Sequence, residues 1–284
     1  MHRSILLATA LLAAATTGLA AQGTGTRVSV NGMQMYYEVS GEGEPLVVLH
    51  GAYMDIPTTG GIIPKLAESH RVYAVELQGH GRTTDIDRPI TYQHLADDVA
   101  VFMDSVGLEK ADIVGYSMGA IAGLQLAIRH PGKVDQLVFV SGAYDLRGWQ
   151  PEFAAFIPQM TVEGMLAMPF FKEQADRNPA FPALIAKLIQ LEKEPMAWEA
   201  EVRALTAPVL IIAGDADVAT LEHSVEMFNL LGGGAMGDMG KPLGASRLAV
   251  MPATSHTAVI RQVDMLHGFI EPFLAGVTPQ GGFE

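Results

Sequence analysis

The sequence predicts an α/β fold in which helices flank a mostly parallel central sheet, with an N-terminal antiparallel hairpin and an inserted helical cap. Three observations lead to this prediction. Strand-like apolar runs alternate with helix-like segments along most of the chain, an order that is typical of parallel sheets. Two strand-like segments flank Asn31-Gly32, a dipeptide that favours a tight hairpin turn. The alternation stops at Asp145 and resumes only after Thr206.

The predicted elements follow one another in a regular order. The run PLVVLHG at 45–51 is apolar without a break, as in strands that are buried on both faces of a sheet. Helices between successive parallel strands imply right-handed crossovers. The predicted strands cover 26–30, 33–40, 45–51, 71–77, 111–117, 134–142, 208–217 and 246–256, and the predicted helices cover 60–69, 91–107, 118–130, 221–232 and 257–276.

The interruption at 145–206 differs from the rest of the chain in composition. It is rich in Met, Phe, Pro and Trp, and its clearest element is a helix with Asn178 as the N-cap and Pro179 at the first helical position. We therefore expect one α/β core, made of residues 22–144 and 207–284, into which a helical cap of residues 145–206 is inserted.

Residues 1–21 have the layout of a secretory signal peptide. Arg3 supplies a positive start, an apolar stretch follows, and the small residues at 18–20 form a cleavage site, so that cleavage is expected at Ala20 or Ala21. An uncleaved membrane anchor is the alternative, because the uncharged part of this segment is almost long enough to span a bilayer. The pattern favours an exported protein, periplasmic or extracellular.

The composition narrows the classes of protein and partner. The 284 residues are 49% hydrophobic and 17% charged, which suits a folded globular chain. The formal net charge of −13 argues against nucleic acid and anionic membranes as partners, which leaves a small-molecule substrate and no membrane contact after signal cleavage. Without cysteine, and with nine histidines that show no HExxH spacing, we expect neither a metal nor a cofactor. The oligomeric state stays open.

A glycine-rich stretch at 232–244 resembles a phosphate-binding loop only at first sight. Ala235 stands where the first glycine of a GxxxxGK motif belongs, and Pro242 replaces the required Ser or Thr. We therefore predict a surface loop between a helix and a strand.

The pentapeptide GYSMG at 115–119 places a serine between a predicted strand and a predicted helix. Chemistry at a serine requires a base that takes its proton, a third group that orients the base, and donors for the oxyanion. Each should lie at the carboxyl end of a parallel strand, where an open α/β sheet builds its site. Ser117, Asp217 and His256 all follow such strands, in the order nucleophile, acid and base.

The neighbours of these three residues have expected roles too. Glycines on both sides of the serine remove side chains that would collide in a strained turn. The backbone N–H groups of Ala52 and Met118 are the expected oxyanion donors. For the acid, Asp145 is the alternative to Asp217, because it follows the preceding strand.

Five motifs together resemble the α/β-hydrolase fold superfamily: HGAY, ELQGHGRT, GYSMG, GDAD, and SH before a terminal helix. The resemblance covers about Thr26 to Ala275 and points to the cap-bearing, cofactor-free serine esterases and lactonase-like members. It implies acyl transfer through an acyl-enzyme. One departure is Glu76, where such sequences more often carry Asp, at a position that is structural in the family.

Aromatic residues near the expected site indicate the class of substrate. Tyr53, Tyr116, Trp149 and Phe170 are candidate pocket residues. They favour a small or medium, uncharged, largely apolar carboxylic ester or lactone, and no Arg cluster marks a phosphate or carboxylate site. Three alternatives stay open: a cofactor-free perhydrolase, a hydrolase of carbon–carbon bonds with the same triad, and a non-catalytic ligand-binding homologue.

Overall fold

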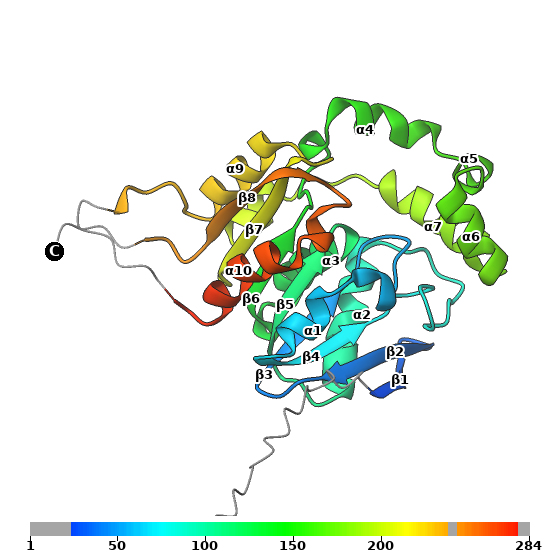
Figure 1. The fold of residues 1–284 in the computed structure, drawn as a ribbon, viewed down its shortest axis with the longest axis horizontal. Helices are drawn as coiled ribbons and strands as arrows, with labels where there is room; N and C mark the ends of the chain where they lie inside the picture. Colours follow the sequence, from blue (N-terminus) through cyan, green and yellow to red (C-terminus); the bar gives the residue numbers. More distant parts are fainter. Residues whose placement is uncertain (1–23, 238–242, 278–284) are drawn as a thin grey trace, which may run out of the picture.

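The fold is built on a sheet of eight strands in the order β1-β2-β4-β3-β5-β6-β7-β8 (Figure 1). A computed structural model describes residues 24–237 and 243–277, so the predicted signal peptide and part of the glycine-rich stretch lie outside the described residues. β2 is antiparallel to both β1 and β4, and the other neighbouring pairs are parallel, which confirms the predicted sheet. The strands are β1 Thr24–Val30, β2 Met33–Ser40, β3 Glu44–Leu49, β4 His70–Val75, β5 Ala111–Tyr116, β6 Val134–Val140, β7 Val209–Ala216 and β8 Arg247–Ser255.

The hairpin between β1 and β2 turns at the predicted dipeptide. Asn31 and Gly32 have φ values of 46° and 88°, as a two-residue turn with two left-handed positions requires. The Asn31 side chain donates a hydrogen bond to Asp98 at 2.8 Å, which ties the turn to helix α2 (Tyr92–Ser105).

Helices cover both faces of the sheet. The flanking helices are α1 Ile62–Leu66, α2 Tyr92–Ser105, α3 Met118–Arg129, α9 Leu221–Leu230 and α10 Val263–Leu274. Five more helices lie between β6 and β7: α4 Pro151–Phe156, α5 Val162–Leu166, α6 Pro169–Arg177, α7 Phe181–Glu192 and α8 Glu199–Arg203. In Figure 1, α4 to α6 stand out from the body of the molecule. Within the described ranges, no helix combines the length and apolar character needed to cross a membrane.

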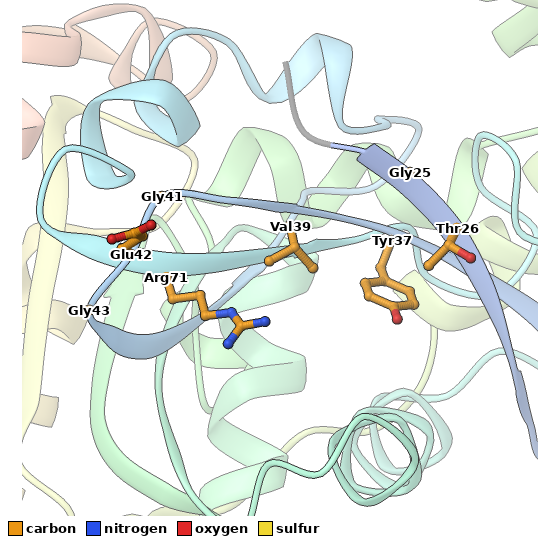
Figure 2. A pocket seen from close by; sticks show the side chains of 8 residues that line it. All are labelled: Gly25, Thr26, Tyr37, Val39, Gly41, Glu42, Gly43 and Arg71. Carbon is orange, nitrogen blue, oxygen red and sulfur yellow. The ribbon is translucent and has the colours of Figure 1, made fainter. Parts of the chain in front are cut away.

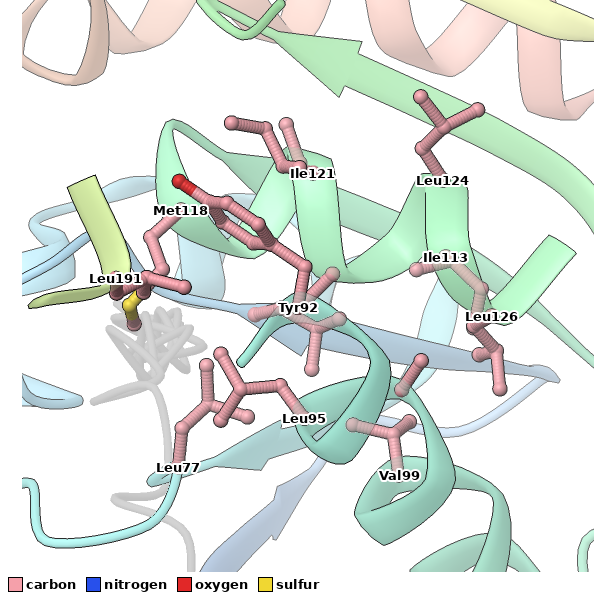
Figure 3. Packing of buried hydrophobic residues seen from close by; sticks show 14 of the residues in the cluster. Leu77, Tyr92, Leu95, Val99, Ile113, Met118, Ile121, Leu124, Leu126 and Leu191 are labelled. Carbon is pink, nitrogen blue, oxygen red and sulfur yellow. The ribbon is translucent and has the colours of Figure 1, made fainter. Parts of the chain in front are cut away.

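The two faces of β3 explain its unbroken apolar sequence. Val47 and Leu49 pack into a core cluster with α2 and α3, part of which is drawn in Figure 3, whereas Leu46 and Val48 pack into a second cluster with α1 and α10. Because side chains alternate along a strand, a strand covered on both faces must be apolar at every position. Each such side chain contributes about 1.5 to 3 kcal/mol by burial.

Two predicted helix starts are wrong. The helix predicted to begin at Pro179, with Asn178 as its N-cap, begins at Phe181, because Asn178 directly follows α6 and its side chain accepts a hydrogen bond from the Ala180 N–H at 3.0 Å. This local turn uses the side chain that would have capped the helix. The last helix begins at Val263, after a separate short turn at Val259–Arg261.

Candidate active site

Ser117 occupies a strained turn between β5 and α3. Its φ and ψ are 54° and −119°, outside the regions that non-glycine residues ordinarily adopt. Such a conformation costs on the order of 1 to 3 kcal/mol and persists only when the surroundings impose it. Here the Ser117 N–H donates to the Val140 carbonyl at 2.8 Å, so the neighbouring strand β6 holds the turn in place.

The flanking glycines are required by close contacts of the backbone. A Cβ on Gly115 would lie 2.3 Å from the Gly119 carbonyl oxygen, and a Cβ on Gly119 would lie 2.3 Å from the Leu49 carbonyl oxygen. Both distances are far shorter than van der Waals contact. The steric reason expected for these glycines is therefore confirmed.

The structure brings Ser117, His256 and Asp217 together in a hydrogen-bonded relay. His256 Nε2 lies 3.0 Å from Ser117 Oγ, and His256 Nδ1 lies 2.7 Å from Asp217 Oδ1. The carboxylate can only accept, so Nδ1 carries the proton and Nε2 is free to accept from the serine hydroxyl. The Asp217 side chain is fully buried, whereas that of His256 is 20% exposed.

Asp217 is held as an anion by several donors. Its Oδ2 accepts from Ser141 Oγ at 2.5 Å and from the Gly214 N–H at 3.3 Å, and its Oδ1 accepts from the Val218 N–H at 2.7 Å. Burial alone would raise the pKa of Asp217, but the hydrogen bond and charge of His256, together with these donors, bring the pKa below its ordinary value. Asp217 therefore stays ionised beside the imidazole.

Ser141 was missed by the sequence analysis. It follows β6, the strand that lies between β5 and β7, and its φ is 56°. Ser141 could have been identified from its position, because it lies at the end of the strand between the two strands that Ser117 and Asp217 follow.

The loop that carries His256 has its own supports. Asp215 accepts hydrogen bonds from the Ala253 and Thr254 N–H groups at 2.8 and 2.9 Å. The Tyr116 hydroxyl donates to the His256 carbonyl at 2.8 Å, and the two rings lie 5.2 Å apart. Tyr116, expected as a pocket residue, thus braces the histidine, and Asp215 is a second support that the sequence analysis did not identify.

Asp145, the alternative acid, is engaged elsewhere. Its carboxylate accepts from the Arg147 N–H at 2.8 Å and pairs with the Arg147 guanidinium at 3.1 Å. Of the two candidate acids, the structure brings Asp217 to the imidazole.

The two expected oxyanion donors lie on neighbouring segments. Met118 is the first residue of α3, and the first N–H groups of a helix have no partner within it. The contact of Gly119 with the Leu49 and His50 carbonyls presses the start of α3 against the end of β3, just before Ala52. His50 fixes that loop, because its Nδ1 donates to the Gly51 carbonyl at 2.8 Å.

The other candidate pocket residues differ in their surroundings. Tyr53 follows Ala52, and its ring packs edge-on against Phe171 at 5.0 Å. Trp149 is buried against Phe153, with ring centres 5.6 Å apart. Phe170 is 46% exposed, so it is the one of the four that faces solvent.

Glu76 is a structural residue, as the resemblance implied. Its side chain is fully buried and forms an ion pair with Arg82, whose own N–H also donates to it. The Ile56 N–H donates to the same carboxylate at 3.3 Å. Glu76 therefore joins two loops beside the site, and the longer side chain in place of Asp is accommodated.

A separate hollow of about 730 Å³ lies at the other end of the sheet (Figure 2). Glu42 and Arg71, which line it, flank the amino ends of β3 and β4, whereas Ser117 follows the carboxyl end of β5. It is therefore not part of the relay site. Across the residues with described positions, no group of three or more His, Asp or Glu side chains is arranged to hold a metal ion.

Comparison with known proteins agrees with this fold. Residues 44–168 match the family described as alpha/beta hydrolase fold. The chain is 29% identical over 226 residues to a 2-hydroxymuconate semialdehyde hydrolase from Pseudomonas sp. strain CF600, a match that covers 68% of this chain and 77% of that one. It is 32% identical over 114 residues to a pimeloyl-(acyl-carrier protein) methyl ester esterase from Aeromonas hydrophila, covering 39% of this chain and 42% of the relative.

Solved structures agree on the architecture. A membrane phospholipase A, described as a bacterial virulence factor, superimposes with a TM-score of 0.75 at 22% identity, covering 91% of this chain and 87% of that one. The enol-lactonase from Burkholderia xenovorans LB400 superimposes with a TM-score of 0.67 at 20% identity, covering 88% and 100%. The chain thus has the α/β-hydrolase fold, and the relatives that it matches include proteins named as a hydrolase and an esterase.

Proposed function

We propose that this protein is a serine hydrolase that cleaves a small or medium carboxylic ester or lactone with a largely apolar body. The observation that carries the proposal is the relay of 3.0 and 2.7 Å from Ser117 through His256 to Asp217 at the ends of three strands. Similarity to proteins named as an esterase and a lactonase supports the choice of bond.

The first half of the reaction forms an acyl-enzyme. His256 Nε2 takes the proton of Ser117 as Oγ attacks the carbonyl carbon. The negative charge that develops on the carbonyl oxygen is held by the N–H groups of Ala52 and Met118, each worth about 3 kcal/mol in related chemistry. The imidazolium, stabilised by Asp217, then protonates the leaving alcohol as the carbon–oxygen bond breaks.

The second half releases the acid. Water gives one proton to His256 and attacks the acyl carbon, and the same proton returns to Ser117 Oγ as the acyl group leaves. The enzyme is regenerated, and one water is consumed for each ester or lactone bond. Because only a lactone keeps its alcohol tethered to the acyl group, ring opening gives a single hydroxy-acid product.

A panel of p-nitrophenyl esters and lactones tests the proposal against the Ser117→Ala variant. We expect turnover of at least one member and a loss of about 10⁴-fold or more in the variant, because no other group replaces the nucleophile. Ser105→Ala, an exposed serine on α2, is the matched control. The proposal fails if the panel is not turned over and an organophosphate does not label Ser117.

Hydrolysis of a carbon–carbon bond in a β-diketone-like substrate is the second candidate. It is favoured by the long match to the hydrolase from Pseudomonas, which covers 68% of this chain. Turnover of a β-diketone faster than any ester in the panel, with the same dependence on Ser117, would select it. Peroxide-dependent turnover would select the perhydrolase alternative instead.

We also propose that the protein is exported. The layout of residues 1–21 supports this, with a positive start and a small-residue cleavage site. N-terminal sequencing of the protein from a host periplasm or medium is expected to give a chain that begins at Ala21 or Gln22. A mature chain that still begins at Met1 would favour the membrane anchor.

A further inference from the structure

Ala52, the expected oxyanion donor after β3, lies in a tight turn. The Met54 N–H donates to the Gly51 carbonyl at 3.3 Å, which closes a four-residue turn with Ala52 and Tyr53 at its two central positions. Tyr53 has a φ of 63°, whereas the φ of Ala52 is not positive. A positive φ at the second central position alone is the pattern of a type II turn.

The start of this turn orients the donor. His50 Nδ1 donates to the Gly51 carbonyl at 2.8 Å, and the Tyr116 ring lies against Gly51, where a Cβ would come within 3.0 Å of two ring carbons. The Gly51 carbonyl and the Ala52 N–H belong to one peptide unit and point in opposite directions, because the peptide is trans. The Ala52 N–H therefore points away from His50.

The second central position of the turn is strained. Type II turns usually carry glycine there, because a side chain disfavours a positive φ. A tyrosine in the left-handed region costs on the order of 1 to 3 kcal/mol and keeps this conformation only where its surroundings impose it. Contacts of the Tyr53 side chain must therefore offset the cost.

A cap helix provides such a contact. The ring of Phe171, on α6, packs edge-on against the Tyr53 ring with centres 5.0 Å apart. Edge-on aromatic pairs contribute about 0.5 to 1.5 kcal/mol beyond burial, which is comparable to the cost of the turn. Phe171 stacks in turn on Phe181, the buried first residue of α7, at 6.4 Å. A continuous set of ring contacts thus joins α7 and α6 to the oxyanion turn.

We infer that Phe171 is a positioning residue that keeps the oxyanion turn in shape through Tyr53. The inference rests on the proposed hydrolysis at Ser117, because the turn acts on an oxyanion only in that reaction. Without the Phe171 ring, Tyr53 can leave the left-handed region, and the Ala52 N–H then moves away from the carbonyl oxygen of the substrate. Met118, at the start of α3, keeps its place, so part of the oxyanion stabilisation remains. The cap thereby acts on the chemical step.

An ester and its thiono counterpart test this inference. p-Nitrophenyl butyrate and O-(p-nitrophenyl) thiobutyrate differ in the carbonyl oxygen, which is replaced by sulfur, a weak hydrogen-bond acceptor. We expect Phe171→Ala to lower kcat on the oxygen ester about tenfold, with KM changed less than about twofold, because one of two donors is displaced. On the thiono ester, kcat should fall less than about twofold. Phe156→Ala removes a ring on α4 that is 40% exposed, and as the matched control it should change neither value.

A second background shows whether Phe171 acts through Tyr53. Glycine adopts a positive φ without strain, so the turn of Tyr53→Gly does not need the contact with the cap. Adding Phe171→Ala to Tyr53→Gly should therefore change kcat less than about twofold. An undiminished tenfold loss in this background would overturn the inference.

The remaining results also decide. An equal loss of kcat on the two esters, or a higher KM at unchanged kcat, overturns the inference and leaves the hydrolase proposal intact. If Phe171→Ala does not fold, Phe171→Leu, which keeps apolar volume without the ring, should show the same selective loss at smaller size. If the native protein cleaves no panel ester and an organophosphate does not label Ser117, the hydrolase proposal fails and this inference fails with it. If labelling occurs without turnover, paraoxon should label Phe171→Ala more slowly than the native protein and parathion should label both at similar rates; equal slowing with the two reagents overturns the inference.

Discussion

Two carboxylates, Asp217 directly after β7 and Glu192 at the end of α7, lie in opposite environments. Asp217 receives donors from Ser141, Gly214 and Val218 and pairs with His256, and its pKa is below the ordinary value. Glu192 has no ion pair among the described side chains, and burial raises its pKa to about 7. Burial opposes ionisation in both, so the donors decide the difference.

The difference follows from how the two regions are built. Loops at the ends of adjacent parallel strands lie within one strand spacing of each other, so their N–H and hydroxyl groups converge on a carboxylate between them. Glu192, at the end of a helix, has no such set of donors among the described residues. We conclude that the strand ends form a preorganised site.

The largest effect is expected when Asp217, the carboxylate that accepts several hydrogen bonds, is replaced by a neutral residue. Asp217→Asn should lower kcat by about 10³- to 10⁴-fold, because an amide cannot hold the imidazole in the required tautomer or stabilise the imidazolium. Steady-state kinetics on the best ester of the panel measures this. Asp145→Asn is the control and should change kcat by less than about twofold, since Asp145 bonds Arg147. The opposite ranking of the two variants would assign the acid to Asp145.

A smaller loss is expected when one donor to Asp217 is removed. Ser141→Ala should lower kcat about tenfold with little change in KM, because the hydroxyl bonds the acid and not the substrate. The same kinetics with Ser105→Ala as the control checks this. A rise in KM without a fall in kcat would mean that Ser141 contacts the substrate instead.

The smallest effect concerns stability. Most substitutions of buried residues destabilise a protein, whereas replacing Glu192 by Gln is expected to stabilise this one. Because the pKa of Glu192 is raised to about 7, the folded protein holds a proton that the unfolded chain loses from about pH 4.5 upward. Ionisation of Glu192 therefore lowers the free energy of unfolding as pH rises towards and through 7. Glu192→Gln should be more stable than the native protein at pH 8, by on the order of 1 kcal/mol, with a smaller difference at pH 5.

Urea denaturation of both proteins at the two pH values measures that difference. The comparison with Glu201→Gln removes the effect of net charge, and the shared pH dependence of other buried groups cancels between variant and native protein. An equal difference at pH 5 and pH 8 would show that Glu192 does not titrate in this window.

Periodicity and strand-end position predicted most of the core of the fold and the central part of the candidate site. The unbroken apolar run of β3 and the Asn31-Gly32 turn are local patterns with one structural solution, and both were predicted. Ser117, Asp217 and His256 were found because parallel strands bring their carboxyl ends to one edge. The start of α7 was predicted wrongly. The Asn178 side chain accepts a hydrogen bond in a local turn instead of capping the helix, and the sequence is compatible with both arrangements.

The sequence by itself determined the alternating elements, the glycines of the nucleophile turn and the three residues at the strand ends, because each depends on neighbours along the chain or on the order of the strands. Only the tertiary structure decided that Ser141 and Asp215 support the relay, that Tyr116 braces His256 and that burial raises the pKa of Glu192. These depend on distances between segments far apart in the chain, and burial and partners, which set the pKa of a carboxylate, exist only once those segments have packed.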